Sequence, residues 1–258
     1  MRDRVRVLAA GSLRHALPEI AAAFEKAGGA AVSISLGPAG LLRERIEAGE
    51  PFDLFASANM AHPQRLVSIG LAKDALCFAR NSLAIIARAD LGLTTENVAD
   101  VLSNPSIRIG TSTPGDDPSG DYAFEMFDRL EADRPGLGNA LKSRALQLVG
   151  GRNSQPGLSA SGLIADGVVD LFLSYASNAR LHAKDPALTV VQLPARLSPS
   201  ISYGVAVRTA AGQSATLLKD FLLTERAASI LVANGFLPES GDPLAIGNDG
   251  AHHQPMRS

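Results

Sequence analysis

The residues best suited to chemistry in this sequence are a hydroxyl and a group of backbone amides near the N-terminus. An apolar run over residues 5–10 ends in an Ala-Ala-Gly turn, and Ser12 follows directly, ahead of apolar residues at helical spacing. We expect Ser12 to be the N-cap of that helix. The free N–H groups of a helix start, together with a hydroxyl, suit an anion. The segment therefore predicts an anion site, with simple helix capping as the alternative.

Three further loops offer small side chains and free amides at or near a predicted helix start: Gly37–Gly40, Ser57–Ala58 and Asp117–Gly120. Each loop alone is equally typical of an ordinary turn. Taken together with Ser12, they predict an oxyanion that is bound by helix dipoles and hydroxyls, without a formal countercharge.

Motifs of enzyme chemistry do not occur in the sequence. There is no Gly-x-Ser-x-Gly turn, no phosphate loop ending in Gly-Lys-Ser/Thr and no His-Glu-x-x-His pair. Asp116 and Asp117 are adjacent carboxylates, which we expect to be solvated in a loop rather than to form a catalytic couple. The sequence predicts a binding protein, with no catalytic residues and no cofactor.

Composition narrows the choice of partners. With 258 residues, of which 46% are hydrophobic, the chain is long enough to bury a good core in one large or two modest domains. A formal net charge of -2 favours neither a nucleic-acid partner nor a membrane surface. The single cysteine, Cys77, excludes an internal disulfide and a cysteine-based metal cluster. No apolar run approaches the ~20 residues of a membrane span, so we expect no membrane insertion.

Strands and helices are predicted to alternate, which indicates an α/β fold with mostly parallel sheets. In the first third we expect strands near residues 5–10, 31–36 and 53–56, with helices from about 13 to 26 and 41 to 48. A second unit has strands expected near 80–88, 107–110, 145–149 and 169–174, and helices near 95–102, 120–130 and 158–166. A strand at 201–207 would return to the first unit, before two final helices.

This order predicts two lobes joined by two crossings of the chain. Lobe I would comprise residues 1–80 and 196–240, lobe II residues 81–195, and residues 241–258 a flexible tail. Crossings near 80 and 195 would leave a cleft and a hinge between the lobes. Ligands of open α/β sheets bind outside the carboxyl ends of strands, so we expect the ligand in that cleft.

Several of these segments resemble the molybdate-binding proteins of ABC transporters, which have the type II periplasmic binding-protein fold. The resembling stretches are residues 7–13 (VLAAGSL), 41–58 (LLRERIEAGEPFDLFASA), 81–83 (NSL), 118–120 (PSG), 170–179 (DLFLSYASNA) and 234–236 (NGF). The resemblance implies a protein that captures molybdate or tungstate for a membrane permease and its ATPase. It further implies a monomer located in the periplasm. Because we find no signal peptide at the start of the sequence, we expect a mature form or a cytoplasmic protein.

By position, the resemblance also implies which residues contact the oxyanion from the two lobes. These are Ser12, Ala39, Ala58, Ser119, Asn153 and Ser154 in the loop 153–157, and Tyr175. The same residues would form a metal site only in the sense that molybdate and tungstate are metal oxyanions.

The sequence departs from the family pattern at four positions. Ala39 stands where serine is usual, Ser119 where alanine or tyrosine is more common, and Asn178 where aspartate is usual, while Arg152 lies in a loop unlike that of the family. A different oxyanion is therefore an alternative ligand. A cytoplasmic anion-sensing or regulatory domain of the same fold is the alternative function.

Overall fold

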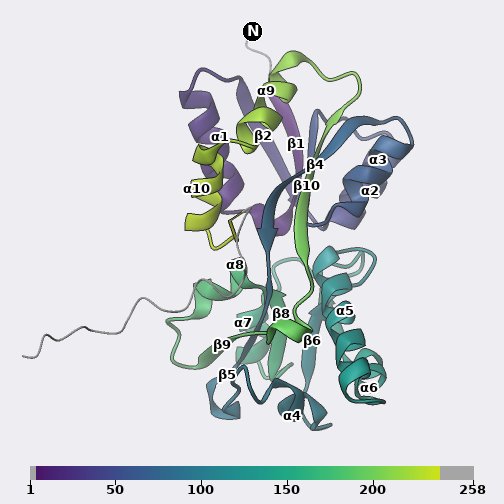
Figure 1. The fold of residues 1–258 in the computed structure, drawn as a ribbon, viewed down its shortest axis with the longest axis vertical. Helices are drawn as coiled ribbons and strands as arrows, with labels where there is room; N and C mark the ends of the chain where they lie inside the picture. The colour runs from purple at the N-terminus through teal and green to yellow at the C-terminus, as the bar shows by residue number, and fades with distance from the viewer. Residues whose placement is uncertain (1–3, 239–258) are drawn as a thin grey trace, which may run out of the picture.

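Two five-stranded sheets, each covered by helices on both faces, form the core of the protein (Figure 1). The structure is a computed structural model that describes residues 4–238. The strand order is β2-β1-β3-β10-β4 in sheet A and β7-β6-β8-β5-β9 in sheet B. The expected α/β class is confirmed.

Sheet A is parallel in its first half and mixed in its second. Its strands are β1 (Arg4–Ala10), β2 (Ala31–Gly37), β3 (Leu54–Ser57), β4 (Ala72–Asn81) and β10 (Ile201–Arg208). Strand β1 pairs in parallel with β2 and β3, and β10 runs antiparallel to both β3 and β4. The helices packed around this sheet are α1 (Ala16–Lys26), α2 (Ala39–Glu47), α3 (Ala61–Ser68), α9 (Gln213–Leu222) and α10 (Glu225–Ala233).

Sheet B has the same mixed design. Its strands are β5 (Leu83–Arg88), β6 (Ile109–Ser112), β7 (Leu146–Val149), β8 (Leu171–Tyr175) and β9 (Leu188–Gln192). Strand β6 is parallel to β7 and β8, and β5 is antiparallel to β8 and β9. Its helices are α4 (Val98–Ser103), α5 (Pro118–Asp133), α6 (Leu137–Arg144), α7 (Ala160–Ala165) and α8 (Ala176–Ala179). Residues 4–238 also contain four short 3-10 helices: η1 (Gly11–Leu13), η2 (Ala89–Leu91), η3 (Arg180–His182) and η4 (Ala195–Leu197).

The carboxyl ends of the parallel strands in the two sheets face each other. In sheet A, β1, β2, β3 and β4 all end at the edge where Asn81 lies. Only one residue separates Asn81 from Leu83, which begins β5 and pairs with Tyr175 at the end of β8. The loops that follow both sets of strands therefore meet in one region between the sheets, where α/β proteins bind ligands.

The chain changes sheets twice, as Figure 1 shows. It leaves sheet A between Asn81 and Leu83, and it returns from β9 to β10 between Gln192 and Ile201. One cluster of buried apolar side chains extends across both sheets, and it includes Tyr175 of sheet B and Tyr203 of sheet A. The tail expected at 241–258 lies outside the described residues.

Ser12 differs from the sequence-based expectation in its local role. It lies inside η1, while α1 begins only at Ala16, and the residue before α1 is His15, which makes no capping hydrogen bond. The prediction of Ser12 as an N-cap is wrong. Pro18 supplies the physical reason: a proline without an N–H is tolerated only in the first turn of an α-helix, so the helix starts close to it. Helix α6 and strand β9 were also not expected from the sequence.

A buried carboxylate fixes the start of β8. Asp170 is 5% exposed, and its Oδ2 accepts hydrogen bonds from the backbone N–H and the Nε of Arg108 at 2.8 and 3.0 Å. Its Oδ1 accepts from Arg108 Nη2 at 2.7 Å and from Arg88 Nη1 at 3.0 Å. Because Arg88 ends β5 and Arg108 precedes β6, one carboxylate joins three neighbouring strands. The side-chain hydrogen bonds from Arg108 outweigh burial and hold the pKa of Asp170 below its ordinary value.

Replacing this carboxylate should destabilise the fold in a pH-dependent way. Because the pKa is lowered in the folded state, Asp170 stabilises the protein above its unfolded pKa of about 3.9, and the effect is lost as the pH falls through the folded-state pKa. We expect Asp170→Asn to cost about 2 kcal/mol at pH 7, less than for a fully buried pair because both arginines touch solvent. At roughly 2–4 °C per kcal/mol, the melting temperature should fall by about 4–8 °C.

Asp90→Asn is the matched control, since Asp90 also pairs with Arg88 but its side chain is 70% exposed. Thermal melts at pH 7 and near pH 3 check the prediction. Equal melting temperatures for the wild type and Asp170→Asn at pH 7 would contradict it, as would a difference that persists unchanged at low pH.

Candidate ligand cleft between the sheets

A cavity of about 560 Å³ lies where the carboxyl edges of the two sheets meet. Its walls come from η1, the end of β2, the start of α5, the loop 149–160, the end of β8 and η3. Of the residues predicted to bind ligand, it brings together Ser12, Ser119 and Tyr175. These three hydroxyls come from both sheets and surround one space.

The hydroxyl of Tyr175 is buried in this wall without a protein partner. Tyr175 is 3% exposed, and its Oη has no hydrogen bond within the described chain. Burial raises the pKa of this phenol well above its ordinary value, so the group is a neutral donor. Buried polar groups are almost always paired, and an unpaired one marks a place where a partner is to be sought. At the edge of a cavity, that partner is a ligand or a solvent molecule.

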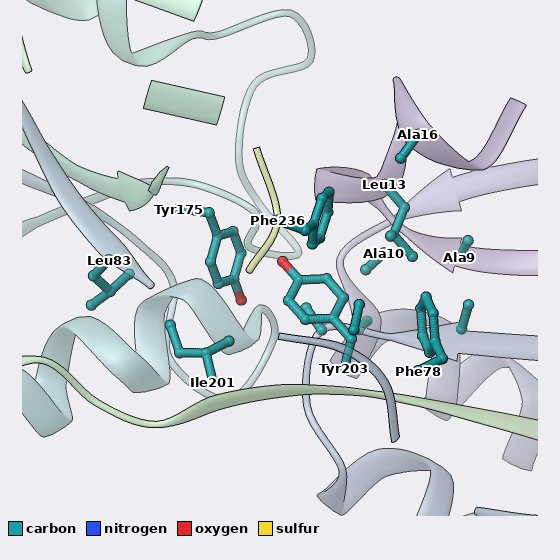
Figure 2. Packing of buried hydrophobic residues seen from close by; sticks show 14 of the residues in the cluster. Ala9, Ala10, Leu13, Ala16, Phe78, Leu83, Tyr175, Ile201, Tyr203 and Phe236 are labelled. Carbon is teal, nitrogen blue, oxygen red and sulfur yellow. The ribbon is translucent and has the colours of Figure 1, made fainter. Parts of the chain in front are cut away.

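Tyr175 is positioned by the aromatic rings around it. Its ring packs against that of Tyr203 with centroids 5.7 Å apart and against Tyr122 at 6.4 Å, both edge to face. Figure 2 shows the rings of Tyr175, Tyr203 and Phe236 gathered at the junction of the two sheets. Edge-to-face pairs have preferred geometry, so the phenol is held in place.

Ser12 belongs to a hydrogen-bonded chain that spans the crossing point. Its Oγ lies 2.8 Å from Tyr203 Oη, and Asn81 Nδ2 donates to the same Tyr203 oxygen at 3.3 Å and to Ser177 Oγ at 2.8 Å. Since Tyr203 accepts from Asn81, its own proton is available for Ser12. Ser12 can then accept from Tyr203 and turn its hydroxyl proton toward the cavity.

Asp117 is a wall residue that the sequence analysis did not assign to the site. Its Oδ2 accepts from Ser112 Oγ at 2.5 Å and its Oδ1 from Ser119 N–H at 3.3 Å, so it is the N-cap of α5. It lines the cavity rather than standing in open solvent, so the expected solvated carboxylate pair is wrong for Asp117. Burial, only partly offset by the Ser112 bond, raises the pKa of this carboxyl. An aspartate followed by proline at a helix start was the available sequence signal.

The start of α2 is occupied by the protein itself. The N–H groups of Gly40 and Leu41 donate to the backbone carbonyl of Asp116 at 3.0 and 3.3 Å. Ala39 and Ala58 are buried and are not part of the cavity wall. The two amides expected to attract an anion here instead connect α2 beside sheet A to the loop before α5.

Arg152 reinforces the same contact on the surface. Its Nη2 lies 2.6 Å from Glu44 Oε2 on α2, and its backbone N–H donates to Asp116 Oδ2 at 2.8 Å. Asn153 and Ser154 line a second, neighbouring hollow, and Ser154 Oγ accepts from the Gly151 N–H at 2.9 Å. From this loop, Gly150 and Gly157 line the main cavity. The structure thus does not bring Asn153 and Ser154 together with Ser12 and Tyr175.

Two other features bear on what the site can hold. Within residues 4–238, no group of three or more histidine, cysteine, aspartate or glutamate side chains is arranged to hold a metal ion. In the same part of the chain, no helix combines the length and the apolar character needed to cross a membrane.

Comparison with known proteins decides the family. Residues 5–237 match the family model described as bacterial extracellular solute-binding protein. The chain belongs to this family. An uncharacterised protein of Pasteurella multocida is 35% identical over 240 residues, which cover 91% of this chain and 98% of that protein. This family consists of binding proteins, which confirms the expectation of a binding protein rather than an enzyme.

Relatives with a named ligand match over a shorter length or at lower identity. The molybdate-binding protein ModA of Escherichia coli is 31% identical over 140 residues, or 50% of this chain and 52% of ModA. The periplasmic molybdate-binding protein of Azotobacter vinelandii has the same fold, with a TM-score of 0.72 and 25% identity over 90% of this chain and 98% of that one. The type II periplasmic binding-protein fold is thereby confirmed.

The contact between α2 and the Asp116 loop generates a prediction about lobe closure. A Cβ atom on Gly40 would lie 2.6 Å from the Asp116 carbonyl oxygen and would also collide with that of Gly115. Gly40→Ala should leave α2 intact, because alanine favours a helix, but it cannot coexist with this contact. We expect the cleft to open on the side where α2 meets the Asp116 loop, and the radius of gyration in small-angle scattering to rise.

Gly212→Ala is the control, since its added Cβ would meet no atom within 4 Å. A scattering profile of Gly40→Ala identical to those of the wild type and the control would show that this contact does not hold the lobes together.

Proposed function

We propose that this solute-binding protein captures a tetrahedral oxyanion in the cavity between the sheets and delivers it to an ABC permease with its ATPase. The observation that carries the proposal is the buried, unpaired hydroxyl of Tyr175 on the same cavity wall as Ser12 and Ser119. Three neutral donors from two sheets suit an anion that is held by hydrogen bonds, each worth about 1.5–3 kcal/mol to a charged partner. A location in the periplasm and a monomeric state belong to the same proposal.

Capture by donors from both sheets links binding to closure. Ser12 follows β1 of sheet A, whereas Ser119 and Tyr175 belong to elements around sheet B. An anion that contacts all three does so only when the sheets are close, so its binding shifts the population toward the closed form. A permease that recognises the closed form would then distinguish loaded from empty protein.

Molybdate and tungstate are the first inorganic candidates. Support comes from the E. coli relative, which is 31% identical over about half of each chain. Ala39 argues against these two anions, because it stands where the molybdate-binding proteins usually have serine, and its buried methyl group supplies no hydroxyl. Calorimetric titration with molybdate, tungstate, sulfate and phosphate tests the class of ligand. If none of them binds at millimolar concentration, inorganic oxyanion capture is wrong.

Tyr175→Phe should separate stability from binding. Removing an unpaired buried hydroxyl leaves no broken bond behind, so we expect the melting temperature of the free protein to stay the same or to rise. If the hydroxyl donates to the anion, affinity for the tightest-binding oxyanion should fall about tenfold to a hundredfold. Melting curves and calorimetric titrations of the same samples measure both.

Tyr122→Phe is the matched control, since Tyr122 contacts the Tyr175 ring but does not line the cavity. The proposed role of Tyr175 fails if both variants bind the anion as tightly as the wild type.

Asp117 should make anion affinity depend on pH. Its pKa is raised in the folded protein, and its charged form repels an anion in the same cavity. Affinity should therefore be highest at low pH and fall as the pH rises through this raised pKa. Asp117→Asn keeps the helix cap but removes the charge, so we expect it to bind about tenfold or more tightly at high pH. The pH dependence should become smaller, while His15 and His182, which line the same cavity, are unchanged.

Asp121→Asn is the control. Asp121 lies one turn further along α5 and does not line the cavity, so its removal should change anion affinity much less. Titrations between pH 5 and pH 9 decide the matter. An unchanged pH profile in Asp117→Asn would mean that the anion lies away from this carboxyl.

A further inference from the structure

The cavity extends beyond its polar end into an apolar arm along one face of sheet B. Ser174 and Phe172 are two residues apart on β8 and therefore lie on the same face, with Ser174 nearer the edge. Phe172 stands opposite Ile86 on β5, and both line the cavity. On this face of the sheet the wall thus changes from a hydroxyl at the edge to hydrocarbon deeper along the strands, while Ser159, Asn178 and His182 line the cavity from the surrounding loops and helices.

The arm is shaped by packing within sheet B. Phe172 and Ile86 belong to a separate apolar cluster on the side of α7 and α8, away from the main core. A Cβ on Gly110 would collide with the Phe172 ring, so the ring can pack here because residue 110 has no side chain. The floor of the arm is therefore a fixed surface that belongs to the folded core.

Exposed leucines form the outer wall of the arm. Leu158 in the loop before α7 is 38% exposed, and Leu181 in η3 is 51% exposed, yet both line this cavity. Large apolar side chains left in contact with solvent around a hollow are typical of ligand-binding grooves. Ala160, the first residue of α7, lies between them in sequence and also lines the wall.

The size of the cavity agrees with its chemistry. Its volume of about 560 Å³ falls in the range of roughly 300–1,000 Å³ that is usual for organic ligands. An inorganic oxyanion with five heavy atoms, bound at the hydroxyls, would leave the apolar arm filled with water. Apolar surface gains free energy when water leaves it, so the arm favours a ligand that extends into it.

We infer that the ligand is an organic oxyanion, with a phosphonate, sulfonate or phosphate head at the hydroxyls and a short hydrocarbon group in the arm. This inference rests on the proposed function, because it uses the same polar end for the head group. It adds that the arm formed by Phe172, Ile86, Leu158 and Leu181 determines which anion binds best.

The test is a homologous series with a constant head group. The free protein is titrated with methyl-, ethyl-, propyl- and butylphosphonate, alongside molybdate and sulfate. Each methylene that enters the arm should tighten binding about fourfold, the value of a buried methylene group. Butylphosphonate should then bind at least tenfold more tightly than methylphosphonate and more tightly than either inorganic anion.

Variants of the arm separate this effect from a general gain in hydrophobic contact. The double change Leu158→Ser with Leu181→Ser should reduce the ratio of butylphosphonate affinity to methylphosphonate affinity. Ala160→Leu should fill the arm and weaken butylphosphonate selectively. Leu217→Ser, at a 49% exposed leucine on α9 outside the cavity, is the matched control and should change nothing.

The outcomes distinguish the two proposals. If molybdate or sulfate binds, and affinity is flat or falls along the phosphonate series, the organic group is wrong while oxyanion capture stands. If no member of either set binds, oxyanion capture itself is wrong. A chain-length preference that survives in both arm variants would place the hydrocarbon elsewhere and overturn the assignment of the arm.

Discussion

Tyr203 holds the two sheets together at the point where the chain passes between them. It is fully buried on β10 of sheet A, and its ring packs edge to face against Phe78, Tyr175 and Phe236. Its hydroxyl hydrogen bonds to Ser12 and accepts from Asn81, which in turn bonds to Ser177 beside sheet B. Two of the three hydroxyls that we assign to the ligand, those of Ser12 and Tyr175, therefore depend on this single residue for their positions. The ligand site and the contact between the two sheets therefore share the same residues.

The helix starts around the cleft show why side-chain hydroxyls become the main donors. Parallel strands with following helices direct free amides toward the edge of a sheet, and such amides attract anions. In this chain two of those helix starts are satisfied internally, because the Asp116 carbonyl accepts from the first turn of α2 and the Asp117 carboxylate caps α5. Oxygen atoms of the protein thus accept the hydrogen bonds that these amides would otherwise donate to an anion. The hydroxyls on Ser12, Ser119 and Tyr175 are left for a ligand, and Arg14, His15 and His182 line the same cavity.

The sequence predicted what depends on neighbouring residues and missed what depends on distant ones. The apolar run of β1 and the glycine-rich loop before α2 are local patterns, and the strands and helices expected from them are present. The role of Ser12 was missed because its partner, Tyr203, is 191 residues away. Asn153 and Ser154 were assigned by resemblance, in a loop where the match was weakest, and they line the neighbouring hollow. No local pattern indicates that Phe172 and Ile86 line a cavity, because their apolar character is equally typical of a core.

The contacts on the two sides of the cleft differ in kind, and this difference governs how easily it opens. On the side of the crossing strands, Tyr203 and Asn81 make buried hydrogen bonds, which water does not replace without loss. On the opposite side, Arg152 and Glu44 form an exposed ion pair, and pairs of this kind contribute about 0–1 kcal/mol and are screened by salt. The backbone bonds from Gly40 and Leu41 to Asp116 reinforce that side. The contacts between α2 and the Asp116 loop are therefore the weaker of the two sets, and the buried contacts of Tyr203 and Asn81 are the stronger. A ligand that contacts both sheets shifts the population toward the closed form by as much as it prefers that form.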